Sequence, residues 1–164
     1  MGGMEFDERL RRAIERGEEA RAARGQADLE REMTLEELRT LHSRYRVEIS
    51  DHIENALRKL VEMMPGFEFS TVMNDDGWGG RIYRDDLNLT PRKGAESLYS
   101  RLEVFVPPFT PAGLLEIVVK GTVRNREVLN RTHFQKLAEI DLVILKDMID
   151  MHVLEFAERF SAAA

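Results

Sequence analysis

The chain has 164 residues, 43% of them hydrophobic, and a formal net charge of −6. That length and apolar content fit a single domain with its own core, and the acidic charge argues against indiscriminate binding to nucleic acid. The absence of cysteine excludes disulfides, thiolate metal sites and thiol catalysis, and it is compatible with a reducing cytoplasm. The N-terminus lacks an apolar leader, and the longest apolar run is LVIL at 142–145, so we expect neither export nor a membrane span.

The N-terminal stretch is a helix-prone arm. Phe6, Leu10 and Ile14 recur every four residues, after which glycines interrupt the pattern. So short an apolar stripe does not hold a helix against a core. We therefore predict an arm over 1–31, either a helix ordered by a partner or a frayed tail, followed by one α+β domain over 32–164.

A longer helix is predicted to begin at Thr34. The sequence TLEE is a capping box, in which the threonine hydroxyl accepts a hydrogen bond from the backbone N–H of Glu37 while that glutamate reaches back. Apolar residues then recur at spacings of three and four until Pro65 and Gly66, which are predicted to end the helix.

Four strand candidates follow this helix, three of them with clear alternation of apolar residues. They cover 67–73, 80–89, 98–106 and 114–124. The second alternates poorly and carries charges toward both faces, which is typical of an edge strand. The proline-rich connection PPFTPAG joins the last two as a hairpin, and no helical pattern separates the strands, so we predict an antiparallel meander.

A second long helix is predicted to follow the strands. Thr132 and Gln135 form another capping-box candidate, and the apolar spacing of a helix continues to Phe160. The predicted fold is therefore α+β: a long helix, a four-stranded antiparallel meander and a long C-terminal helix, with both helices on one sheet face and an N-terminal helical arm.

The final helix is apolar on more than one side, because large apolar residues between 140 and 154 point in nearly every direction around its axis. Such a helix is buried on more than one side, and a second copy of the chain would supply the second cover. The sequence thus predicts a homodimer through the long helices, or else an arm that folds back within one chain. The predicted interface residues are Leu145, Met148, Ile149, His152 and Phe156.

The segment NDDGWGG at 74–80 concentrates two carboxylates, three glycines and the single tryptophan of the chain. Its polar residues are consecutive rather than alternate, so it lacks the spacing of a calcium-binding loop. Asp-Gly between two strands is instead typical of a type I′ hairpin turn. Two positions for Trp78 are open: packed onto the sheet edge, or exposed beside Arg81 as a stacking platform.

Arginines cluster in RNREVLNRTH, residues 124–133, ahead of the predicted final helix. Arginine side chains that converge on a helix N-terminus would form a pocket for a carboxylate or phosphate. The alternative is a solvated connector whose arginines pair with acidic residues of a neighbour. The candidate ligand-binding residues are Trp78, Arg81, Arg124, Arg126 and Arg131.

Histidine and glutamate share a helix face at two places. Glu48 with His52, and His152 with Glu155, have the spacing of a carboxylate–histidine pair. The paired Glu-x-x-His signature of di-iron bundles is absent, and hydrogen-bonded core histidines are favoured. The sequence predicts no metal, no cofactor and no catalytic residue, and Asp141 is interpreted as either solvent-facing or an interface charge.

These observations favour a non-enzymatic, self-associating binding module. Its expected partners are a second copy of the chain and another protein. The competing hypothesis is a small anionic-ligand-binding domain or enzyme, with a pocket near the 74–81 turn and the 124–133 connector. An acidic chaperone-like protein that covers an apolar client segment is a further alternative. Neither nucleic acid nor a membrane is an expected partner.

Overall fold

The structure is a computed structural model that describes residues 2–31, 33–90 and 94–163. Side chains are described for residues 5–25, 33–87 and 94–163. The chain divides into two compact units, Met1–Glu37 and Leu38–Ala164.

The first unit consists mainly of helix α1, Gly2–Arg31. Every described side chain of α1 is exposed, including Phe6, Leu10 and Ile14 at 61%, 48% and 53%. The helical arm predicted from the sequence is therefore present, and the described residues of its short apolar stripe are exposed to solvent.

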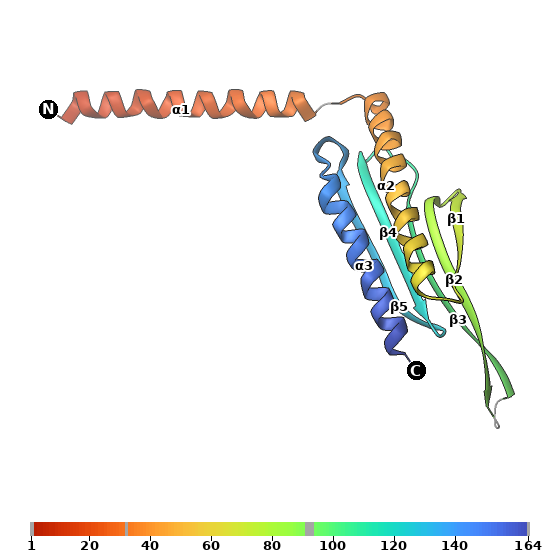
Figure 1. The fold of residues 1–164 in the computed structure, drawn as a ribbon. Coiled ribbons are helices and arrows are strands. Elements are labelled where there is room, and N and C mark those ends of the chain that lie inside the picture. Colours follow the sequence, from red (N-terminus) through yellow and green to blue (C-terminus); the bar gives the residue numbers. More distant parts are fainter. Residues whose placement is uncertain (1, 32, 91–93, 164) are drawn as a thin grey trace. The chain divides into compact units, whose positions relative to one another are not determined.

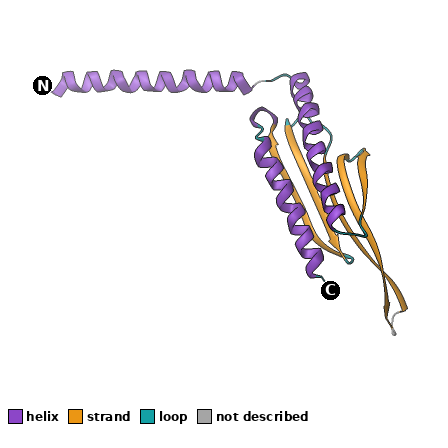
Figure 2. Cartoon of the chain, viewed as in Figure 1, coloured by secondary structure: helices purple, strands orange, loops and turns teal. Residues whose placement is uncertain are grey.

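The second unit places two helices on a five-stranded sheet (Figure 1 and Figure 2). Helix α2, Leu35–Met63, begins where predicted, because the Thr34 hydroxyl accepts a hydrogen bond from the Glu37 backbone N–H at 3.1 Å. The strands pair antiparallel in chain order and are β1 (Glu68–Asn74), β2 (Gly77–Thr90), β3 (Gly94–Val106), β4 (Leu114–Val123) and β5 (Arg126–Lys136). They are followed by a 3₁₀ turn, η1 (Leu137–Glu139), and by helix α3 (Leu142–Ala162).

The sheet has five strands rather than the predicted four. Strand β5 pairs with β4 along its length, so Thr132 and Gln135 lie in a strand and their predicted capping role is wrong. Helix α3 begins only at Leu142. Its N-cap is Asp141, whose Oδ1 accepts a hydrogen bond from the Ile144 backbone N–H at 3.2 Å.

Two features hid β5 from the sequence analysis. The turn that precedes it consists of Arg124 and Asn125, whose φ angles of 47° and 68° fit the type I′ class without the glycine that usually signals it. In addition, β5 is an edge strand with charged and polar residues on both faces, so its apolar alternation is weak.

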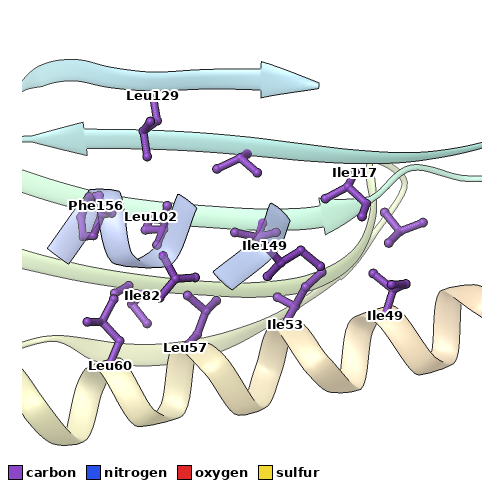
Figure 3. Close-up of a cluster of buried hydrophobic side chains, with 14 of the residues drawn as sticks. Ile49, Ile53, Leu57, Leu60, Ile82, Leu102, Ile117, Leu129, Ile149 and Phe156 are labelled. Atoms are coloured by element: carbon purple, nitrogen blue, oxygen red, sulfur yellow. The ribbon is translucent and has the colours of Figure 1, made fainter. Parts of the chain in front are cut away.

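Both helices cover the same face of the sheet. Gly80 of β2 faces Leu57 of α2, and Gly121 of β4 faces Phe156 of α3. The residues of β3 that pair with these two glycines are two positions apart. Alternate residues of a strand share a face, so both glycines lie on the face that the helices cover. The core between the layers is apolar, and Figure 3 labels Ile49, Ile53, Leu57, Leu60, Ile82, Leu102, Ile117, Leu129, Ile149 and Phe156.

The segment NDDGWGG forms the β1–β2 hairpin, which confirms the predicted turn region. Asn74 and Gly77 pair across Asp75 and Asp76, and the Asn74 Oδ1 accepts a hydrogen bond from the Asp76 N–H at 2.9 Å. Neither aspartate has a positive φ, so the turn is not of type I′. The glycines permit close packing, because a Cβ on Gly77 or Gly79 would lie 2.2 or 2.0 Å from a carbonyl oxygen of β3.

Candidate functional site

A groove of about 560 Å³ lies between α2 and α3, and the described residues that line it all belong to these two helices. Ala56, Leu60 and Val153 form its apolar floor. Met63 and Leu154 also line it, and their side chains are 82% and 69% exposed. On α2 these apolar residues recur at spacings of three and four, so they occupy one helix face beside the core-facing residues. The groove is thus an apolar surface next to the core and open to solvent.

Two polar contacts join the helices beside this groove. The His52 Nε2 lies 2.8 Å from the Asp150 Oδ1, and the Lys146 Nζ lies 3.3 Å from the Glu48 Oε1. Both pairs are partly exposed, so each contributes only about 1 kcal/mol or less to stability. Their effect on the groove is geometric, because they join α2 to α3 at two points, of which His52 and Asp150 also line the groove.

The outward side of α3 adds further apolar side chains. Val143, Ile144 and Met151 are 69%, 50% and 53% exposed. We refer to Met63, Val143, Ile144, Met151 and Leu154 together as the helix-layer surface. Large apolar side chains gathered on one surface are typical of a contact with another macromolecule.

The interface residues predicted from the sequence lie on a different side of α3. Leu145, Ile149, His152 and Phe156 are buried within the chain, with 4% exposure or less, and Met148 is half-buried. The sequence analysis found the apolar excess of α3 but could not decide which apolar side meets the sheet. It therefore missed Met63, Val143, Ile144, Met151 and Leu154 as the solvent-facing set.

His152 contacts His133 of β5 rather than a metal-ligating carboxylate. Their Nε2 atoms are 2.7 Å apart, and the His152 Nδ1 lies 3.6 Å from the Glu155 Oε2. Burial lowers the pKa of His133, and the charges of His152 and Arg131 lower that pKa further. Among the described residues, no group of three His, Asp or Glu side chains is arranged to hold a metal ion.

Three of the predicted ligand-binding residues lie apart from one another. Arg46 of α2 covers the Trp78 ring at 4.1 Å, so Trp78 lies on the helix side of the sheet. Arg81 is three positions further along β2 and faces the opposite side, where its guanidinium lies 5.5 Å from the Tyr83 ring. Arg131 lies on β5, paired with Val119 of β4. The structure does not bring these three residues into one pocket.

The remaining two predicted ligand-binding residues do share a cavity. Arg124 and Arg126 line a space of about 550 Å³ together with Arg159 of α3. The predicted helix N-terminus is not there, because the cavity lies against the last turn of α3. Sequence analysis missed Arg159, whose position in the last turn of a helix is ordinarily explained by the helix dipole.

Comparison of the chain with protein-family models, with curated proteins and with solved structures finds no match. The class of protein is defined by the fold: an α+β domain with helices against a five-stranded antiparallel meander. None of the described helices is both long and apolar enough to cross a membrane.

Proposed function

We propose that this chain is a non-enzymatic interaction module that self-associates as a homodimer through the helix-layer surface. The supporting observation is the exposure of five large apolar side chains, at 50% to 82%, along α3 and at the α2–α3 groove. Single exposed apolar residues are ordinary on a monomer. A gathered set beside an apolar groove is typical of a protein–protein contact.

The size of this surface suggests a dimer that dissociates. Moving one large apolar side chain from full exposure to full burial contributes about 1.5–3 kcal/mol. Scaled by the exposed fractions and counted on two copies, full burial of the helix-layer surface would give about 10–19 kcal/mol. Association costs roughly 4–15 kcal/mol, so the two quantities are comparable and an obligate dimer is not expected.

A twofold arrangement fits the positions of these residues, because an isologous interface places the same surface of each copy against the other. In this arrangement Leu154 of one copy enters the groove of the other beside Met63. Asp147 and Glu158 are exposed on the same side of α3, one helical turn from Met151 and Leu154 respectively, so the arrangement must leave both carboxylates in contact with water.

Sedimentation velocity over a micromolar concentration series tests this function. The parent chain is expected to pass from monomer to dimer as its concentration rises. Replacing Met151→Glu and Leu154→Glu together is expected to leave a folded monomer, because association would bury unpaired carboxylates.

The matched control is Val47→Glu. Val47 is an apolar residue of α2 that is 49% exposed and does not line the groove. This variant should dimerise as the parent chain does. A parent chain that stays monomeric over the whole series, or a double variant that dimerises normally, contradicts the proposed function.

The location that we propose for this module is the cytoplasm. The absence of cysteine supports a reducing compartment. Cell fractionation with a tagged full-length chain checks this location, and recovery in an oxidising compartment would contradict it.

A further inference from the structure

The β4–β5 turn is held in one conformation by hydrogen bonds to β3. The Asn125 Oδ1 accepts a hydrogen bond from the Tyr99 N–H at 2.9 Å, and the Asn125 Nδ2 donates to the Ser97 carbonyl at 2.8 Å. The backbone N–H of Arg124 donates to the Ser100 hydroxyl at 2.9 Å. The Asn125 side chain thus takes the place of a strand partner for β3 beyond the end of β4. The backbone that carries the side chains of this turn is therefore fixed before any ligand binds, which lowers the entropy cost of binding.

Arg124 in the turn and Arg126 at the start of β5 line the cavity of about 550 Å³ described above. Val123 and Val128 of the same hairpin give the cavity apolar walls. The last turn of α3 closes another side, and Arg159 adds a third guanidinium group. The cavity therefore combines three positive charges with apolar surface.

Two of the three positive charges of this cavity lack a partner within the described residues. No acidic residue lines the cavity, and the ion pairs and hydrogen bonds of the described residues include none from the side chains of Arg124 or Arg126. The Arg124 Nε is buried without a hydrogen-bond partner. Arg159 has one partner, the partly exposed Glu155, at 3.3 Å. Like charges that line one cavity repel one another, so an anion bound in the cavity is favoured.

We propose that this cavity binds an oxyanion of the phosphate class, such as the phosphate group of a small phosphorylated compound. A phosphate group carries about −1.5 to −2 charge at neutral pH and offers several strong acceptor oxygens. It therefore matches three guanidinium groups better than a single carboxylate does. The planar fork of arginine donates to two oxygens at once, and the valine walls accommodate a small organic part of the ligand.

Basic side chains at this end of a helix also have a role that needs no ligand, since they interact favourably with the last carbonyl groups. In α3, the carbonyls of Arg159 and Phe160 already accept hydrogen bonds from the Ala163 N–H, at 3.1 and 3.2 Å. The two roles differ in one measurable respect. Helix stabilisation is present in the unliganded chain, whereas a binding site gives saturable occupancy by phosphate.

Titration of the full-length chain with inorganic pyrophosphate at constant ionic strength, followed by amide NMR, tests the site. Saturable shifts are expected around 121–129 and 157–163. Replacing Arg124→Gln and Arg126→Gln together should weaken binding by about tenfold or more, because two charge-assisted donors are lost. Arg126→Lys keeps the charge without the fork and should fall between the parent and the double variant.

The matched control replaces Arg11→Gln and Arg44→Gln, two exposed arginines of α1 and α2, and makes the same change in net charge. It should bind as tightly as the parent chain. The proposal is overturned by the absence of saturable binding, or by equal losses in the two double variants. It is also overturned if the Arg124 and Arg126 variant loses stability but keeps its affinity, because helix stabilisation then accounts for the arginines. The last ligand to compare is citrate, a carboxylate. If citrate binds as tightly as pyrophosphate, the assignment to phosphate is overturned.

Discussion

His133 of β5 and His152 of α3 share a hydrogen bond through their Nε2 atoms, which are 2.7 Å apart. The ring centroids are 4.9 Å apart. This distance is close to the Nε2–Nε2 distance plus the distance from each centroid to its own Nε2, so the two nitrogens point at each other nearly in line. One Nε2 must therefore donate a proton and the other must accept it. The pair joins the edge strand to the helix layer only while at least one ring is neutral.

This pair predicts a loss of stability in mild acid. The unfolded chain protonates His133 near the ordinary pKa of about 6.5, whereas burial, His152 and Arg131 lower the pKa of His133 in the folded chain. Between these two pKa values the unfolded chain binds more protons, so the free energy of unfolding decreases as the pH falls below about 6.5. Burial also lowers the pKa of His42, which acts in the same direction.

The variant His133→Gln removes one of these titrating groups. Its free energy of unfolding should fall less than that of the parent chain between about pH 7.5 and about pH 5.5, and His42 remains as one source of the loss. Urea unfolding at the two pH values measures both differences. An unchanged dependence on pH in the variant would show that His133 is not a source of it.

Gly79 and Gly80 should differ in how much stability the chain loses when each is replaced by alanine. A Cβ on Gly79 would lie 2.0 Å from the Val104 carbonyl oxygen, which is backbone and cannot move without disturbing the sheet. We expect Gly79→Ala to reduce the free energy of unfolding by about 3 kcal/mol or more. A Cβ on Gly80 would meet the ends of the Leu57 and Phe69 side chains at 2.9 and 3.0 Å, so Gly80→Ala should cost only about 1 kcal/mol. Chemical denaturation of the two variants tests the difference, and equal losses would contradict it.

Asn125 combines a positive φ of 68° with two side-chain hydrogen bonds to β3. Asn125→Gly keeps the backbone conformation but loses the hydrogen bonds, and should reduce stability by about 1–2 kcal/mol. Asn125→Ala loses the hydrogen bonds and also strains the backbone, and should cost roughly 1 kcal/mol more. Thermal unfolding ranks the variants, and an alanine variant as stable as the glycine variant would argue against strain at this position.

Asp141 should contribute about 1 kcal/mol to stability as the N-cap of α3, because its side chain satisfies one otherwise unpaired N–H. Asp141→Ala is therefore expected to lower the free energy of unfolding by about that amount. Asp147 is the control, since it is an exposed aspartate inside the same helix. Asp147→Ala should change stability by at most about 0.5 kcal/mol, and chemical denaturation compares the two.

Much of the fold could be predicted because burial leaves a clear period in the sequence. The stripe that ends in Leu60 has the spacing of a helix packed on one side, and the predicted start at Thr34 agrees with the observed cap. The strands β3 and β4 alternate because one face packs against the helices while the other does not. Strand β5 could not be recognised in this way, since an edge strand with polar residues on both faces has no strong period.

The candidate sites were predictable only where chain neighbours remain neighbours in space. Arg124 and Arg126 share a cavity because a two-residue turn lies between β4 and β5 and keeps them together. Trp78 and Arg81 are only three positions apart, but the alternation of a strand directs them to opposite faces. The groove between α2 and α3 depends on which side of α3 meets the sheet, and a helix with apolar residues all around does not encode that choice in its period.

The order of the strands in the meander also predicts the order in which the elements form during folding. Each strand pairs with its neighbour in sequence, so the sheet forms through short loop closures, whereas the contact between His52 and Asp150 spans 98 residues. Long loops close at a greater entropy cost, and contacts between distant residues slow folding. We therefore expect the hairpins to form first and the two helices to dock together last. The groove then comes into existence only in the final step, when the rest of the sheet is already in place.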